Sequence, residues 1–138
     1  MPNEKFLIVI DAGHGGHDAG ATFKDVREKD IVRKIALQVV DANHDPDVEL
    51  TVIGEEDKFI DLDARIKAVN SLKPSVLVSL HVNSSSDVSR HGAEVYISPK
   101  NGFYDKSKAI ANNMMALFGS DAAKIVEKDF YEMPNAPR

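Results

Sequence analysis

Two histidines in this chain are placed where a metal ion could be held. His14 follows an apolar run, Phe6–Ala12. His81 lies at the end of a second apolar run, Ser75–Val82. Both runs are rich in β-branched residues and are predicted to be buried parallel strands. Because ligands bind beyond the carboxyl ends of the strands in open α/β sheets, we expect both imidazoles at one rim of the sheet.

Glu28 is the third candidate ligand. It lies in the first turn of a predicted helix, Glu28–Ala42, in which apolar residues recur at helical spacing. At about 100° per residue, its side chain falls on the apolar face of the helix, whereas Lys29 points elsewhere. Such a carboxylate is costly unless it is paired, caps the helix or binds a metal. The alternative, that Glu28 only favours the positive end of the helix, explains its place in the first turn but not its orientation.

Two imidazoles and one carboxylate make a His2Glu set. In a chain without cysteine this set suits Zn2+ in a catalytic site, where the fourth position is left for water or substrate. Asp11 and Asn83 flank the ligands and are expected to orient the imidazoles from the second shell. The remaining histidines are ranked as non-ligands: His17, which is the nearest competitor of His14, His44 and His91.

The glycine-rich stretch Ile10–Gly20, IDAGHGGHDAG, has two other interpretations. A dinucleotide-binding loop reads G-x-G-x-x-G and opens a helix directly. Here Asp18 stands in place of the third glycine, and the helix begins only near Glu28. The G-K-[ST] ending of a P-loop is also absent. Phosphate binding is therefore disfavoured, and a flexible turn with an incidental histidine stays open as the simple alternative.

Strands and helices are expected to alternate along the chain. Besides the elements already named, the patterns predict strands at Glu49–Ile53 and Ala93–Ser98 and helices at Asp61–Leu72 and Lys106–Phe118. This alternation predicts an α/β fold with a twisted, mostly parallel sheet, flanked by helices on both faces, in one domain of residues 1–138. The segment from Asp121 onward fits no element clearly.

Composition excludes several classes of protein. The 138 residues carry a formal net charge of −5, which argues against a nucleic-acid or anionic-membrane binder. No apolar run approaches the roughly 20 residues that span a bilayer. The opening MPNEKFLIVI lacks the features of a signal peptide. We therefore expect no membrane span, and either a cytoplasmic protein or a mature domain without its leader.

Five segments in order resemble the amidase-3 family of zinc-dependent N-acetylmuramoyl-L-alanine amidases, which are cell-wall hydrolases. They are IVIDAGHGGHDAGA, REKD, RIKAVN, VLVSLHVN and GAEVYI, and they extend over most of the chain. The resemblance implies that His14, Glu28 and His81 are the zinc ligands. It also implies a cell-envelope location and a peptidoglycan or muropeptide substrate, cleaved at the amide between N-acetylmuramic acid and L-alanine.

The catalytic base that the family uses is not found in this sequence. The resemblance implies a second glutamate on a late apolar strand that reads like L-[IV]-E, and no such strand follows NAPR. Glu94 matches a position whose residue is not known to act as the base in the family. Glu127 and Glu132 are expected in polar surroundings and not on a strand. The general base therefore stays unknown, and we expect residues 1–138 to be an amidase catalytic domain that lacks its C-terminal strands.

Three functions remain open at this stage. The first is a zinc amidase that acts on peptidoglycan. The second is a catalytically incomplete fragment that binds metal and muropeptide without turnover. The third is another zinc hydrolase, such as a deacetylase or a peptidase, that shares the ligand set by convergence.

Overall fold

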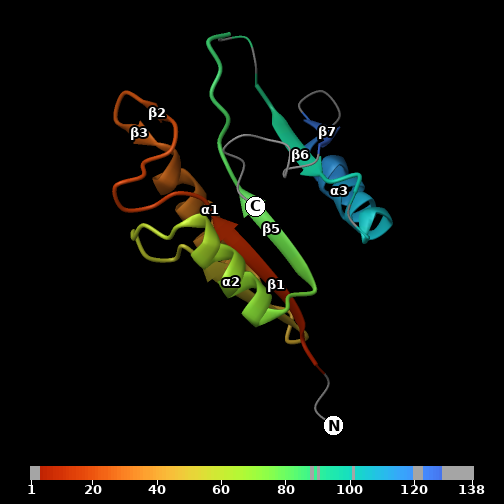
Figure 1. The fold of residues 1–138 in the computed structure, drawn as a ribbon. Helices are drawn as coiled ribbons and strands as arrows, with labels where there is room; N and C mark the ends of the chain where they lie inside the picture. Colours follow the sequence, from red (N-terminus) through yellow and green to blue (C-terminus); the bar gives the residue numbers. More distant parts are fainter. Residues whose placement is uncertain (1–3, 88, 90, 101, 120–122, 129–138) are drawn as a thin grey trace. The chain divides into compact units, whose positions relative to one another are not determined.

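The chain was analysed as a computed structural model that describes residues 4–87, 89, 91–100, 102–119 and 123–128 (Figure 1). Backbone contacts divide the chain into two compact units, Met1–Ser84 and Ser85–Arg138, and each is described by itself. The elements follow in the order β1 (Phe6–Ala12), β2 (Thr22–Phe23), β3 (Val26–Arg27), α1 (Glu28–Ala42), β4 (Val48–Ile53), α2 (Leu62–Leu72), β5 (Val76–Leu80), β6 (Ala93–Ile97), α3 (Tyr104–Phe118) and β7 (Ala123–Glu127).

The first unit is built on a parallel sheet with the strand order β4-β1-β5. The last four residues of the central strand β1 are all buried, as its unbroken apolar run predicts. Asp11 pairs in register with Ile53 on one side and with Ser79 on the other. The carboxyl ends of the three strands are thereby aligned at one edge of the sheet.

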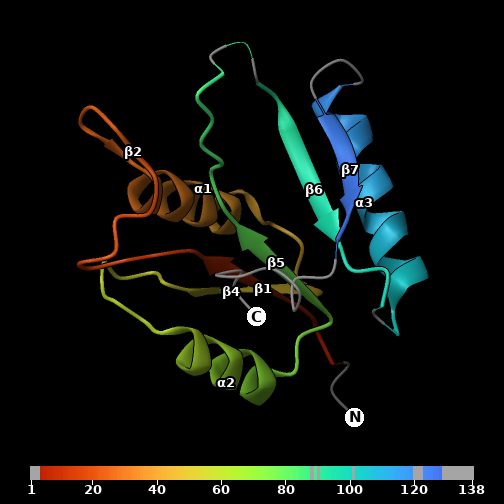
Figure 2. The same cartoon turned by 45° about the horizontal axis from the view of Figure 1, so that its top comes forward.

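Helices cover both faces of this sheet. Figure 2 shows α1 on one face and α2 on the other. Val32 and Ala36 of α1 pack with Ile10 and Ala12 of β1 to form the buried core. Helix α2 begins as predicted, because the side chain of Asp61 accepts a hydrogen bond from the backbone N–H of Ala64 at 2.8 Å.

A short antiparallel hairpin, β2–β3, lies between the glycine-rich loop and α1. The backbone N–H of Glu28 donates to the carbonyl of Ala21 at 2.8 Å, so the start of α1 is tied to the base of the hairpin. The side chains of Phe23 and Val26 are exposed on the hairpin. The first turn of α1 is thus fixed by the chain that precedes it.

The second unit pairs β6 and β7 in parallel, and α3 packs on both strands. Strand β7 corrects the expectation that Glu127 lacks strand context, because Glu127 is the last residue of β7. Only Ile125 and Val126 are strongly apolar in this strand, which is too short a signal to predict a strand by itself. Pairing with β6 supplies the missing context. Glu132 lies outside the described residues.

The predicted α/β class is confirmed, with mostly parallel strands and helices on both faces of the first sheet. The bounds of β1 and α1 agree with the prediction at both ends. Strand β5 is shorter than predicted, since it ends at Leu80. His81 is consequently the first residue beyond the strand. The assignment of residues 1–138 to one domain stays a prediction.

Candidate metal centre

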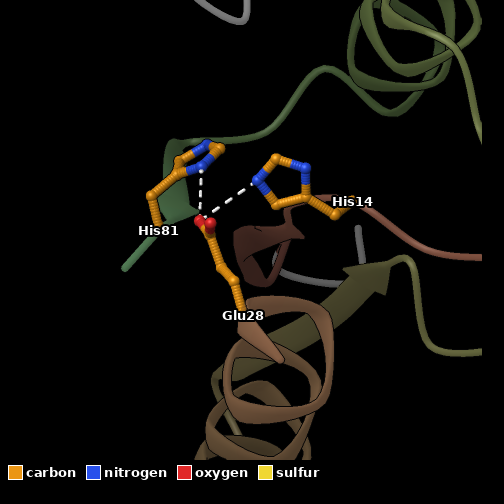
Figure 3. A group of neighbouring side chains, drawn as sticks. All are labelled: His14, Glu28 and His81. Carbon is orange, nitrogen blue, oxygen red and sulfur yellow. Dashed lines mark hydrogen bonds and ion pairs between the residues drawn. The ribbon is translucent and has the colours of Figure 1, made fainter. Parts of the chain in front are cut away.

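His14, Glu28 and His81 lie together at the carboxyl edge of the first sheet (Figure 3). His14 follows β1, Glu28 opens α1 and His81 follows β5. Their three potential ligand atoms lie within 4.8 Å of one another. Parallel pairing of β1 and β5 brings the two histidines together, as expected from the sequence.

The distances in this cluster fit a small tetrahedral cation. Oε1 of Glu28 is 3.1 Å from Nε2 of His14 and 3.3 Å from Nδ1 of His81. For Zn2+ bound at about 2.0–2.1 Å, two ligand atoms of a tetrahedron lie about 3.3–3.4 Å apart. The two distances to Glu28 are thus close to those of a tetrahedral zinc site, and all three ligand atoms lie within 4.8 Å of one another.

Glu28 is buried, as its position on the apolar face predicts, with 4% of its surface exposed. Burial alone would raise the pKa of its carboxyl group. The backbone N–H groups of Ala21 and Val82 each donate to the carboxylate at 2.9 Å, and the nearby imidazoles add to their effect. The net result is a pKa below the ordinary value, so the side chain is held as an anion.

Both ring nitrogens of His14 face a carboxylate. Nδ1 is 2.9 Å from Oδ2 of Asp18, and Nε2 is 3.1 Å from Oε1 of Glu28. A neutral imidazole has one N–H and can donate to only one of these oxygens. If Nδ1–H donates to Asp18, then Nε2 presents its lone pair toward Glu28, an arrangement that a cation between them would stabilise. A histidine that binds metal typically donates its other N–H to such a carboxylate.

Asp18 stays ionised in this arrangement. The hydrogen bond from His14 is the main reason that the pKa of Asp18 lies below its ordinary value, although burial opposes it. The backbone N–H of Gly20 also donates to this carboxylate, at 3.1 Å. From the sequence, Asp18 argues only against a phosphate loop, and its hydrogen bond with His14 is a finding of the structure. The only sequence signal for this hydrogen bond is that Asp18 lies four residues after His14.

The predicted second-shell residue Asp11 does not hydrogen-bond an imidazole directly in the structure. Its carboxylate accepts from Arg65 at 2.6 Å and from the hydroxyl of Ser79 at 3.2 Å. Oγ of Ser79 is in turn 3.1 Å from Nε2 of His81. Asp11 is thus connected to His81 through one intervening hydroxyl group. For Asn83, two residues beyond His81, an orienting role stays a prediction.

The other histidines lie outside the metal-capable group found among the described residues. The ring of His17 is tilted against that of Phe59, with 4.2 Å between the centroids. Nδ1 of His91 hydrogen-bonds the carbonyl oxygen of Ser89. His44 lies in the turn after α1. The ranking of all three as non-ligands stays a prediction.

Lys29 differs from the expectation that it points away from the interior. It is 7% exposed, and its Nζ donates to the carbonyl of Gly16 at 2.9 Å and to Asp57 at 3.0 Å. The backbone N–H of Gly16 also donates to Asp57, at 2.8 Å. Lys29 therefore connects the glycine-rich loop with the segment after β4 through hydrogen bonds to both. Helical periodicity could not reveal a partner 28 residues away.

Two glycines of the loop leave room for the ligands. A Cβ at Gly13 would lie 2.7 Å from Cε1 of His81. At Gly20, which has a φ of +69°, it would lie 2.6 Å from Cδ2 of His14 and 2.7 Å from Oε2 of Glu28. Their small size is what allows the three candidate ligands to converge.

Two of the three glutamates considered as a base, Glu94 and Glu127, lie in the second unit. Glu94, on β6, accepts a hydrogen bond from the hydroxyl of Tyr96 at 2.5 Å and forms an ion pair with Lys124 at 3.2 Å. Glu127, on β7, accepts a hydrogen bond from the hydroxyl of Tyr104. Neither observation assigns the base.

Comparison with known proteins identifies the family. The family described as N-acetylmuramoyl-L-alanine amidase, amidase-3, matches residues 8–136. The chain belongs to this family. The family is named for the hydrolysis of an amide bond.

Particular relatives support the assignment. A sporulation-specific N-acetylmuramoyl-L-alanine amidase of Bacillus subtilis is 36% identical over 97 residues, which cover 69% of this chain and 37% of that protein. An endolysin of Bacillus phage SPP1 is 38% identical over 82 residues, which cover 57% of this chain and 30% of the endolysin. The chain therefore spans well under half of the length of these two relatives.

Solved structures agree with the family. The catalytic domain of CwlV, an N-acetylmuramoyl-L-alanine amidase from Bacillus (Paenibacillus) polymyxa, matches with a TM-score of 0.75 and 31% identity, over 95% of this chain and 75% of that chain. An N-acetylmuramoyl-L-alanine amidase from Clostridium difficile 630 matches with a TM-score of 0.76 and 26% identity, over 93% of this chain and 72% of that chain.

None of the helices in the described part of the chain has the length and apolar character that crossing a membrane requires.

Proposed function

We propose that His14, Glu28 and His81 hold a zinc ion. The observation that carries this proposal is the donor set itself, because two imidazole nitrogens approach one buried carboxylate oxygen at 3.1 and 3.3 Å. The carboxylate of Asp18 also supports the proposal, because a hydrogen bond from Nδ1–H of His14 to Asp18 leaves the Nε2 lone pair of His14 facing Glu28. When bound, zinc polarises a carbonyl group and lowers the pKa of a coordinated water.

We further propose that residues 1–138 form an amidase catalytic domain. The protein to which this domain belongs would cleave the amide between N-acetylmuramic acid and L-alanine of peptidoglycan. Membership of the amidase family supports the substrate class. The place of action would be the cell envelope, in the periplasm or outside the cell, where peptidoglycan is found. Nucleic acid is not a partner in this proposal, which agrees with the net charge of −5.

The chain's own side chains would prepare the site for this reaction. Glu28 supplies a negative charge that the hydrogen bonds from Ala21 and Val82 hold in place. Asp18 holds the His14 ring with Nε2 toward the cluster. These contacts exist before any substrate arrives, so little reorganisation is needed at the moment of reaction.

Release of peptides from purified peptidoglycan tests the proposed activity. Hydrolysis of this amide frees the amino group of L-alanine, so new N-terminal alanine should accumulate with wild-type protein and zinc. His14→Ala should release at least 100-fold less, and His44→Ala, which alters an exposed turn, should match the wild type. Equal release by His14→Ala and the wild type would contradict the site, and release of acetate or cleavage between amino acids would contradict the reaction.

A second candidate function is binding of zinc and muropeptide without turnover. One observation favours it: apart from Glu28, the carboxylates that are connected to the two histidines by the hydrogen bonds of the described residues already accept hydrogen bonds, Asp18 from His14 and Asp11 from Arg65 and Ser79. Neither is thereby available as a base for water. This candidate predicts zinc-dependent retention of muropeptide with no new N-terminal alanine, whereas any accumulation of that product would exclude it.

A further inference from the structure

The guanidinium group of Arg65 connects α2 to the loop that carries His14. Arg65 is 6% exposed. Its Nη1 donates to Oδ1 of Asp11 at 2.6 Å and to the carbonyl of Ala12 at 2.7 Å. Its Nη2 donates to the carbonyl of His14 at 2.6 Å, and its Nε donates to the carbonyl of Ile60 at 3.0 Å. Three of these four acceptors belong to the end of β1 and the turn that follows it.

The contact with His14 bears on an unusual backbone conformation. His14 has a φ of +68°, in the left-handed region that side chains other than glycine seldom adopt. Such a conformation persists only when its surroundings fix it. Arg65 holds the carbonyl groups on both sides of this turn, those of Ala12 and His14. The guanidinium is therefore placed to keep the His14 side chain aimed at the cluster.

A second path leads from Arg65 to His81. Asp11 accepts from Arg65 with one oxygen and from the hydroxyl of Ser79 with the other. Because the single hydroxyl proton of Ser79 goes to Asp11, the Ser79 oxygen accepts from Nε2–H of His81, at 3.1 Å. In a neutral imidazole, Nδ1 of His81 then carries the lone pair, 3.3 Å from Oε1 of Glu28. The chain of hydrogen bonds selects the tautomer that a metal ligand needs.

We propose that Arg65 is a positioning residue for the metal site, which holds the backbone of His14 directly and the ring of His81 through Asp11 and Ser79. The proposal rests on the proposed zinc site. It adds a second role to a buried ion pair that would otherwise only contribute to folding. The two roles differ in what they predict, because a folding role changes the stability of the whole unit, whereas a positioning role changes metal affinity in protein that stays folded.

The dissociation constant for Zn2+ alone, measured by chelator competition well below the unfolding temperature, tests the proposal. Arg65→Lys keeps the charge but loses the planar fork that reaches two carbonyls and a carboxylate. We expect its affinity to fall by about 10- to 100-fold, as is typical when the support of a metal ligand is removed. Ala36→Gly, which lowers stability at a buried position on α1, should leave the affinity within about twofold.

Two variants at Ser79 test the path to His81 without disturbing the buried ion pair. Ser79 is exposed, so neither substitution threatens folding. Ser79→Ala removes the hydroxyl and should weaken zinc binding by about tenfold. Ser79→Thr keeps the hydroxyl on a strand that favours β-branched residues, and should restore binding to within about threefold of the wild type.

Amide hydrogen exchange in the metal-free protein gives a readout that does not depend on zinc. In Arg65→Lys, the amide of Gly15 should exchange at least tenfold faster, while core amides of β1 and α1 change less. The proposal would be overturned if folded Arg65→Lys bound zinc with wild-type affinity. It would also be overturned if the exchange rate rose equally at every amide of this variant. If wild-type protein binds no zinc, the proposed function fails instead, and the exchange data alone decide whether Arg65 positions the loop.

Discussion

Replacement of Gly13 by alanine should displace the His81 ring without removing any backbone hydrogen bond of the fold. Gly13 follows β1 and lies close to the His81 ring. A Cβ built there would lie 2.7 Å from Cε1, 3.1 Å from Nδ1 and 3.3 Å from Nε2 of His81. The φ of Gly13 is outside the left-handed region, so alanine itself fits the backbone. The perturbation is therefore steric and falls on one ligand.

The size of the effect follows from these distances. Ordinary van der Waals contact begins at 3.4 Å, so the ring must withdraw by about 0.7 Å, the difference between 3.4 and 2.7 Å, to restore it. Metal–ligand bond lengths tolerate about 0.2 Å. We therefore expect zinc affinity to fall by about 100-fold, which corresponds to about 2.7 kcal/mol. The free energy of unfolding of the metal-free protein should change by less than about 1 kcal/mol.

Zinc competition with a chelator, together with thermal unfolding of the metal-free protein, measures both quantities. Gly102→Ala is the matched control, because a Cβ at Gly102 meets no atom within 4 Å. The control should bind zinc as the wild type does. If Gly13→Ala binds zinc within threefold of the wild type, His81 is not a ligand held in the observed position.

Three further predictions concern the cluster and its supports. Glu28→Gln removes the charge and should lower zinc affinity by at least about 100-fold, as measured by competition; wild-type affinity would contradict its role as a ligand. The pKa of Asp57 lies below its ordinary value of 3.8, first because Gly16 donates its N–H and next because Lys29 donates to the carboxylate. The ionised form thus stabilises the fold above pH 3.8, and this contribution is lost as the pH falls below that value. Thermal unfolding of Asp57→Asn should accordingly differ from the wild type at pH 7, and the difference should shrink toward pH 2; a difference independent of pH would contradict the ionic role. Asp61→Ala should lower the free energy of unfolding by about 1 kcal/mol through loss of the N-cap, and no loss in a denaturant titration would show that this cap is unimportant.

Local sequence patterns were sufficient for the elements that carry the proposed ligands. The apolar run Phe6–Ala12 predicted a buried strand, and helical spacing predicted α1 with Glu28 facing inward. Both signals act over a few residues, because side-chain periodicity follows directly from backbone geometry. The convergence of His14 and His81 required one further rule, that parallel strands end at the same edge.

Contacts between distant segments could not be predicted in the same way. Arg65 and Asp11 are 54 residues apart, and no periodic pattern relates them. The same is true of the buried Lys29, whose partner Asp57 lies in the loop after β4. Strand β7 was missed because two apolar residues between charged ones do not predict a strand without knowledge of β6. In each case, tertiary contacts decide what local propensity leaves open.

Zinc stoichiometry tests the central claim most directly. Wild-type protein, the double variant His14→Ala/His81→Ala and the control double variant His44→Ala/His91→Ala would be loaded with Zn2+, dialysed and analysed for metal by mass spectrometry. The account predicts one tightly held zinc ion per chain in the wild type and in the control, and none in the first double variant. Equal zinc content in the two double variants would contradict it.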